Sequence, residues 1–198
     1  MRNPLSDKIV SIPPSGIRKF FDIVNEMEGA ISLGVGEPDF DTPWHIREEG
    51  IYSLEKGRTF YTSNAGLKQL KDEICNYLKR RFEVSYDPDT EIMVTVGGSE
   101  AIDVAMRAML NPGDEVITFA PYFGEYRSYV NNFDGVLVEI SPNTVDFQPK
   151  LDEFEAKITP KTKAVIVNTP NNPTGVVYSE ETIRKMAEIM EKKQNEYG

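Results

Sequence analysis

The sequence contains very little cysteine and histidine: its 198 residues include one of each, Cys75 and His45. A single cysteine cannot form a disulfide within the chain, so a small secreted fold stapled by disulfides is excluded. One cysteine and one histidine also provide too few ligands for a structural zinc site. We therefore expect no metal centre.

Positive charge is scarce as well, with 22 Lys and Arg against 32 Asp and Glu and a formal net charge of −10. Nucleic acids and anionic membrane surfaces bind clustered positive charge, so we expect neither as a partner. No stretch approaches the roughly 18 consecutive apolar residues that span a bilayer. The first residues, MRNPLSDKIV, contain no apolar run of signal-peptide length, which predicts a cytoplasmic location.

The second half of the sequence alternates between short β-branched runs and helical patterns. The length and a hydrophobic fraction of 39% are sufficient for one sizeable core. Helices of this length between strands imply right-handed crossovers and a mostly parallel sheet with both faces covered, which predicts the α/β class. The predicted strands are Ile92–Val96, Glu115–Phe119, Val136–Ile140 and Ala164–Asn168. The predicted helices lie near 99–110, 122–133 and 150–157, and from Ser179 as N-cap to about Lys193.

The first 45 residues do not share this alternation, so we expect an N-terminal arm that includes part of a second lobe. A helix is predicted after Ser15, and a short strand over Ala30–Gly36. Thr42 and Pro43 predict the N-cap and first residue of a helix that Gly57 ends. The following helix has an apolar face made of Leu67, Leu70, Ile74, Leu78 and Phe82.

Unusual residues follow the first predicted strand. In an open parallel sheet, ligands bind at the carboxyl ends of the strands. The strand at 92–96 runs into Gly97-Gly98-Ser99-Glu100 at a helix start, where backbone N–H groups and the Ser99 hydroxyl can hold an anion such as phosphate. The alternative is a glycine-rich turn with Ser99 as an ordinary N-cap.

Proline, aromatic and asparagine residues directly follow two more of the predicted strands. The second strand ends in Ala120-Pro121-Tyr122-Phe123, where an aromatic ring either stacks on a flat cofactor or fills the core. The fourth strand leads into NTPNNPTG at 168–175, where an asparagine amide either donates to a ligand or builds a turn. Because three strand ends share this feature, the pattern favours a ligand site.

These segments carry a resemblance to a known family. VTVGGSEAIDVAMRAMLNPGDEVITFAPYF followed by AVIVNTPNNPTGVVYSEE resembles the class I/II aminotransferases, which are pyridoxal-phosphate enzymes of the aspartate aminotransferase fold, or fold type I. ISLGVGEPDFDTP and FYTSNAGLKQLKDEI are similar to the same family in the same order. The resemblance begins near Ser15 and corresponds to the N-terminal half of such an enzyme. It implies a three-layer α/β/α architecture, with an arm and part of the small domain at 1–45 and a truncated large domain at 46–198.

The resemblance also implies roles for individual residues in binding pyridoxal 5′-phosphate. Gly98 and Ser99 would hold the phosphate, and Phe123 would stack on the pyridine ring. Asn172 would donate to the phenolic oxygen of the ring and lie near the substrate carboxylate.

Two further residues are implied outside these strand ends. Gly36 would lie in a loop that contacts substrate. Tyr61 would reach the phosphate of a neighbouring subunit, which implies a homodimer with shared sites. Cis peptides are implied before Pro121 and Pro173.

The resemblance assigns no catalytic residue to this chain. In the family, the aldimine-forming lysine and the acidic partner of the pyridine nitrogen lie beyond the motifs matched here, so we expect the 198 residues alone to be inactive. Ser53-Leu54-Glu55-Lys56 matches the sequence pattern of the lysine motif, S-x-x-K, but lies in an early predicted helix. We therefore interpret Ser53 and Lys56 as solvated helix residues. The family's first strand lies at the far edge of its sheet, so Ile92–Val96 is expected to lack its neighbours.

The implied reaction transfers an amino group between an amino acid and a 2-oxo acid. C–S lyases and aminocyclopropane-carboxylate synthases share these motifs, so related pyridoxal-phosphate chemistry stays open. The other alternative is a non-catalytic fragment that binds at most the cofactor phosphate.

Overall fold

Two compact units make up the chain in the computed structural model, which describes residues 3–12, 20, 23, 24, 26–29, 31, 36 and 38–198. The sheet unit comprises Met1–Lys8 and Val96–Gly198, and the helical unit comprises Ile9–Thr95. Most of the helix predicted after Ser15, and most of the strand predicted over 30–36, lie outside the described residues. The domain boundary near residue 45 stays a prediction.

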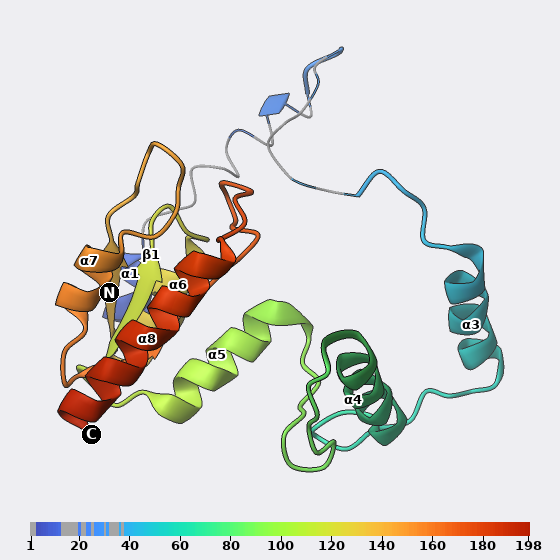
Figure 1. Ribbon diagram of the computed structural model, residues 1–198. Coiled ribbons are helices and arrows are strands. Elements are labelled where there is room, and N and C mark those ends of the chain that lie inside the picture. The colour runs from blue at the N-terminus through green and yellow to red at the C-terminus, as the bar shows by residue number, and fades with distance from the viewer. Residues whose placement is uncertain are drawn as a thin grey trace. The chain divides into compact units, whose positions relative to one another are not determined.

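A parallel sheet forms the centre of the sheet unit (Figure 1). Its spatial order is β2-β1-β3, and its strands are β1 (Glu115–Phe119), β2 (Val136–Ile140) and β3 (Thr162–Val165). Glu115 pairs with Val136 on one side and with Thr162 on the other. β3 begins before the predicted Ala164 because Thr162 already takes part in this pairing. The predicted α/β class with a parallel sheet is confirmed.

Helices cover both faces of this sheet and give three layers. They are α5 (Gly97–Met109), α6 (Glu125–Asn132), α7 (Leu151–Lys157) and α8 (Glu180–Tyr197). Figure 1 shows α7 and α8 beside one another, and the two helices contact each other directly. Ser179 caps α8 as predicted, since its hydroxyl oxygen accepts the backbone N–H of Thr182 at 3.0 Å.

The two helix layers enclose separate hydrophobic cores, because successive side chains of a strand point to opposite faces. The core beneath α7 and α8 consists of Ile117, Phe119, Ile140, Phe154, Ile158 and Met186. The core beneath α5 and α6 centres on Met106, Val116 and Val130. The middle strand, β1, contributes buried side chains to both cores, Ile117 and Phe119 to one and Val116 to the other, as expected for a strand covered on both faces.

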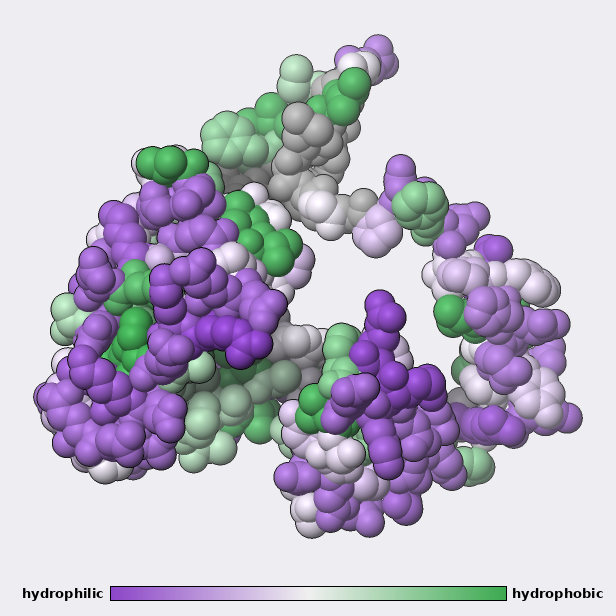
Figure 2. All heavy atoms as spheres, viewed as in Figure 1, coloured by the Kyte–Doolittle hydropathy of each residue, from purple (hydrophilic) through white to green (hydrophobic). Residues whose placement is uncertain are grey.

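Ion pairs one turn apart stabilise the outer face of α8. Arg184 pairs with Glu180 at 2.6 Å, and Lys185 pairs with Glu181 at 2.5 Å. In Figure 2, the face of the sheet unit that carries α8 is mainly hydrophilic. No helix among the described residues is long and apolar enough to cross a membrane.

The segment 92–96 does not form the predicted strand. Its backbone is irregular, and in the part of the chain that the structure describes the three strands of the sheet pair with one another and not with this segment. A strand needs a neighbour for its N–H and C=O groups, so without a neighbour the segment has no ladder to join. This agrees with the expectation that the segment lacks its neighbours in this chain, although the strand itself was wrongly predicted.

The helical unit contains α3 (Trp44–Glu55) and α4 (Lys68–Phe82), while α1 (Asp7–Ser11) precedes them. α3 begins after Pro43, whose ψ of 139° is extended, so neither Thr42 as N-cap nor Pro43 as first helical residue is correct. Gly57 follows the end of this helix with a φ of +63°, as predicted.

α4 forms over the predicted residues, but its apolar face is only partly covered. Ile74 and Leu78 are half-buried, whereas Leu67, Leu70 and Phe82 are exposed. The loop at Gly66 contacts residue 94: the Val94 N–H donates to the Ala65 carbonyl at 3.0 Å. At Gly66, with a φ of +103°, a Cβ would lie 2.7 Å from Val94 Cβ, so this turn requires glycine.

Glu153 of α7 connects this helix to the end of β2. Its carboxylate pairs with Lys157 Nζ at 2.7 Å and accepts from the Ser141 N–H and hydroxyl at 3.0 and 2.9 Å. The Lys157 ammonium, followed by the Ser141 N–H, lowers the pKa of Glu153 from its ordinary 4.5 to about 2. A lowered pKa in the folded state means that this stabilisation is complete above about pH 4.5 and is lost as the pH falls toward 2.

We therefore expect Glu153→Gln to reduce stability at neutral pH and to flatten the pH dependence of unfolding between 4.5 and 2. Urea unfolding at a series of pH values measures both effects. Asp152→Asn, on the same helix, also removes one carboxylate and is the matched control for the change of net charge. Superimposable curves for Glu153→Gln and the wild type would contradict this account.

Candidate functional site

The first turn of α5 places Gly98 and Ser99 at a helix N-terminus. Gly97 begins this helix with a φ of +81°, a conformation that glycine adopts without strain. The N-cap is Val96, which provides no side-chain cap, so the alternative role of Ser99 as N-cap is wrong. Both Gly98 and Ser99 are exposed, and no group in the described part of the chain accepts from them. Their N–H groups and the Ser99 hydroxyl are therefore available to an anion.

Phe123 lies just beyond the carboxyl end of β1. The Ala120–Pro121 peptide is cis, as predicted, and the Phe123 carbonyl accepts the Tyr126 N–H at 3.1 Å. The ring of Phe123 meets the ring of Tyr126 edge to face, with centroids 5.7 Å apart. Phe123 is only half-buried, so part of its ring stays accessible for stacking.

The two asparagines of the NNPTG loop differ in burial. Asn171 is buried, and its Oδ1 accepts from the Thr174 N–H at 3.2 Å and the Thr174 hydroxyl at 2.9 Å. Asn171 thus builds the turn, as the structural alternative predicted. Asn172 is exposed, and its amide side chain makes no hydrogen bond within the part of the chain that the structure describes.

Two peptide bonds before prolines of this loop are cis. The Asn172–Pro173 peptide is cis, which confirms the second of the two predicted cis bonds. Thr169–Pro170 is also cis, which was not predicted.

A side-chain bridge brings Phe123 and Asn172 into one cluster. The Asn168 Nδ2 donates to the Tyr126 hydroxyl at 3.4 Å, and the Asn168 Oδ1 accepts the Asn172 N–H at 3.1 Å. Tyr126 is 5% exposed, and this burial raises its pKa while the Asn168 bond lowers it. No role was predicted for Tyr126 or Asn168, although Tyr126 follows Phe123 at helical spacing and Asn168 is the first residue of the 168–175 loop.

Tyr122 extends the aromatic cluster to a pair of charges. Its ring stacks on Tyr126 with centroids 6.2 Å apart and planes at 11°. Its hydroxyl donates to Glu139 Oε1 at 2.7 Å and accepts from Arg127 Nη2 at 3.0 Å, and Arg127 also pairs with Glu139. Burial first, and then the Glu139 bond, raise the pKa of Tyr122, so the phenol stays protonated at neutral pH.

The remaining predicted residues belong to the helical unit. Gly36 is exposed, and the side chain of Tyr61 is fully accessible, with no hydrogen bond to any described residue. Their contribution to a cofactor site stays a prediction. Ser53 donates to the Gly50 carbonyl at 2.8 Å, and Lys56 lies over the Tyr52 ring at 5.3 Å. Ser53 and Lys56 therefore form no catalytic pair.

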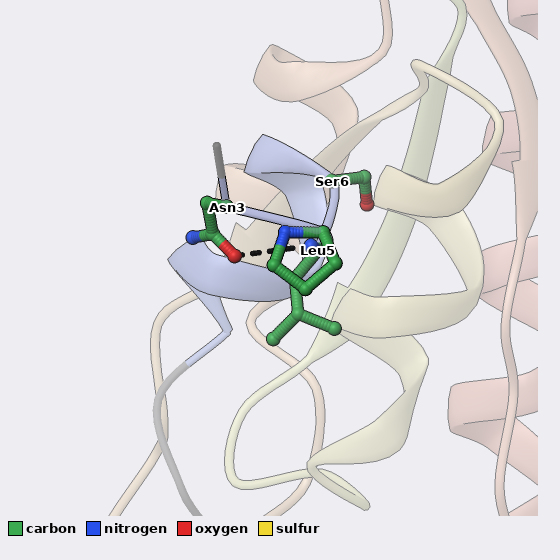
Figure 3. A pocket seen from close by; sticks show the side chains of 4 residues that line it. Asn3, Leu5 and Ser6 are labelled. Carbon is green, nitrogen blue, oxygen red and sulfur yellow. Dashed lines mark hydrogen bonds between the residues drawn. The ribbon is translucent and has the colours of Figure 1, made fainter. Parts of the chain in front are cut away.

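A hollow at the N-terminal segment is a poor alternative site. Asn3, Pro4, Leu5 and Ser6 line it, and the Asn3 Oδ1 accepts the Leu5 N–H at 3.0 Å (Figure 3). None of these four side chains ionises at neutral pH, so the hollow offers no charged group to a substrate. The strand ends remain the candidate site.

Comparison with known proteins identifies the family of the chain. Residues 28–195 match the family described as aminotransferase class I and II, and the match includes residues of both units. The chain therefore belongs to the class I and II aminotransferases, a family that depends on pyridoxal phosphate. The resemblance inferred from the sequence motifs is thereby confirmed.

Several relatives are similar over nearly the whole chain. The putative aminotransferase YugH of Bacillus subtilis is 52% identical over 194 residues, which cover 97% of this chain and 50% of the relative. Aromatic-amino-acid aminotransferase 2 of Thermococcus litoralis is 40% identical, over 93% of this chain and 48% of its own length. The aspartate aminotransferase of Thermus thermophilus with maleate has a TM-score of 0.88 at 36% identity, over 97% of this chain and 51% of that structure. The chain thus spans about half the length of the curated relatives it matches.

The first turn of α5 and the residues beyond the ends of β1 and β3 fit pyridoxal phosphate in their chemistry. The turn of Gly98 and Ser99 offers donors without protein acceptors to a phosphate, which carries negative charge. Phe123 offers a partly accessible ring, and Asn172 offers an unbonded amide to an aromatic ligand with a polar oxygen. No hydrogen bond or ring contact joins Gly98 or Ser99 to the Phe123–Asn172 cluster within the described residues, and their union in one cofactor site stays a prediction.

Proposed function

We propose that this chain is the N-terminal portion of a pyridoxal-phosphate-dependent aminotransferase that transfers an amino group between an amino acid and a 2-oxo acid. The observation that carries this proposal is the bridge from Tyr126 through Asn168 to Asn172. It brings an accessible aromatic ring and an unbonded amide together beyond the carboxyl ends of β1 and β3. In an open parallel sheet, this edge is where ligands bind.

The residues of this chain bind and orient the cofactor in this proposal. Gly98 and Ser99 hold the phosphate, Phe123 packs on the ring, and Asn172 donates to the phenolic oxygen of the ring and lies near the substrate carboxylate. When bound, pyridoxal phosphate supplies the electron sink for chemistry at the α-carbon of the amino acid. Contact of the ring with Phe123 and a bond from Asn172 restrict its orientation, which lowers the entropic part of the barrier.

The same proposal assigns roles to two residues of the helical unit. The hydroxyl of Tyr61, unbonded among the described residues, reaches the phosphate of a neighbouring subunit, and Gly36 contacts substrate. This implies a homodimer with shared sites. The cytoplasmic location predicted from the sequence belongs to this proposal as well.

The 198 residues are proposed to be inactive alone, because the motifs matched here include neither the cofactor-binding lysine nor the acidic partner of the pyridine nitrogen. A chimera tests whether this chain becomes active when a relative supplies these residues. We would fuse residues 1–198 to the part of the Bacillus subtilis relative that follows its matched region, and assay the chimera and the chain alone with a panel of amino acids and 2-oxoglutarate.

We expect the chimera to absorb in the visible when loaded with pyridoxal phosphate and to transfer amino groups, and the chain alone to do neither. A loaded chimera that releases pyruvate and ammonia from β-substituted amino acids without amino transfer would assign the alternative lyase chemistry. A folded chimera that binds no cofactor would contradict the proposal.

A further inference from the structure

Asn168 occupies the point where two loops of the proposed cofactor site meet. One end of its amide donates to the Tyr126 hydroxyl, and the other end accepts the Asn172 N–H. We propose that Asn168 is a positioning residue that fixes the spacing between the ring-contacting Phe123 and the ligand-donating Asn172. The inference rests on the proposed function, because it assigns the group that orients two residues of that same site.

The bond between Asn168 and the Tyr126 hydroxyl restricts the position of the Phe123 ring. Tyr126 is 5% exposed, and its ring meets Phe123 edge to face at 5.7 Å and stacks on Tyr122 at 6.2 Å. The Tyr126 N–H also donates to the Phe123 carbonyl. A buried ring held between two others transmits its position to both, since packed interiors leave little free volume. Fixing the Tyr126 hydroxyl therefore restricts the tilt of the Phe123 ring.

The bond between Asn168 and the Asn172 N–H restricts the position of residue 172, whose side-chain amide is the proposed donor to the ligand. The Asn172 backbone N–H binds Asn168, whereas the neighbouring Asn171 is held independently by its own bonds to Thr174 and Val176. Losing the Asn168 carbonyl oxygen therefore releases residue 172 while the rest of the turn stays in place. An asparagine suits the position because its amide supplies one donor group and one acceptor.

The test compares Asn168→Ala with Asn168→Asp. Alanine removes both contacts, whereas a carboxylate accepts from the Asn172 N–H and from the Tyr126 hydroxyl and so retains the bridge. Hydrogen exchange followed by NMR reports on the loop directly. We expect the Asn172 amide to exchange about tenfold faster in Asn168→Ala, as for the loss of one hydrogen bond. The Gly175 N–H, which donates to the Asn171 carbonyl at 2.7 Å, is the internal control and should not change.

Ligand binding to the same variants provides the second readout. Pyridoxine 5′-phosphate is the probe, because it has no aldehyde and cannot react with surface lysines. We expect Asn168→Ala to weaken its binding about tenfold, to leave inorganic phosphate binding unchanged, and to be rescued by Asn168→Asp. In a double-mutant cycle with Tyr126→Phe, the two losses should be less than additive, because both changes break the same bridge.

The outcomes separate this inference from the proposed function. Equal affinity of the wild type and Asn168→Ala for pyridoxine 5′-phosphate would overturn the positioning role alone. Parallel losses for pyridoxine 5′-phosphate and inorganic phosphate, or faster exchange at both Asn172 and Gly175, would show general loosening and would also overturn it. Failure of the wild-type chain to bind either probe would overturn the proposed cofactor site and the inference with it.

Discussion

Replacing Phe154 by alanine is expected to destabilise the sheet unit by about 3–5 kcal/mol. Phe154 has no exposed surface, and its ring lies 5.3 Å from that of Phe119 across the interface between α7 and β1. Truncation removes the largest of the fully buried side chains and leaves a cavity in a core of six buried residues. Urea unfolding followed by circular dichroism measures the loss.

Phe147→Ala provides the matched control, because it deletes the same atoms from a side chain that is 37% exposed. Because more of the Phe147 side chain is in contact with water in the folded state, its loss is expected to be smaller than that for Phe154→Ala. Similar losses for the two variants would contradict the assignment of Phe154 to the centre of the core.

Ser99→Asp is expected to weaken binding of pyridoxine 5′-phosphate by about a hundredfold or more. The substitution removes a hydroxyl donor and places a carboxylate in the first turn of α5, where the phosphate is proposed to bind. Like charges in contact cost several kcal/mol, and the lost charge-assisted bond adds to this cost. Calorimetric titration of wild type and variant measures the change.

Ala108→Asp makes the same change of charge near the other end of the same helix and serves as the control for net charge. We expect its affinity for the probe to stay within about threefold of the wild type, because exposed charges more than about 10 Å apart are screened at ordinary ionic strength. Equal losses for Ser99→Asp and Ala108→Asp would place the phosphate elsewhere.

Local patterns were sufficient to predict most elements of the sheet unit. Glu115–Phe119 and Val136–Ile140 form strands with the predicted bounds, and Ser179 caps α8, because apolar runs and capping residues act within a few positions of themselves. Residues 92–96 failed as a strand because pairing depends on a neighbour, which a local pattern does not reveal.

The family motifs were sufficient to name candidate site residues, but not the contacts that form between distant side chains. Gly98, Ser99, Phe123 and Asn172 were identified from motifs, and the structure places all four in the sheet unit. The bond between Tyr126 and Asn168 joins residues 42 positions apart, on α6 and after β3, so no spacing in one segment signals it. The sequence also does not reveal that Asn171 builds the turn while Asn172 stays exposed, because this depends on which of the two side chains turns inward.

The most direct test of the central claim is the affinity of the 198-residue chain for pyridoxine 5′-phosphate compared with pyridoxine, measured by isothermal titration calorimetry. The account predicts that the phosphorylated probe binds at least about a hundredfold more tightly, and that inorganic phosphate competes with it, because charge-assisted bonds to the first turn of α5 dominate. Equal affinities for the two probes, or binding that inorganic phosphate does not affect, would contradict the claim that this chain carries the cofactor phosphate site.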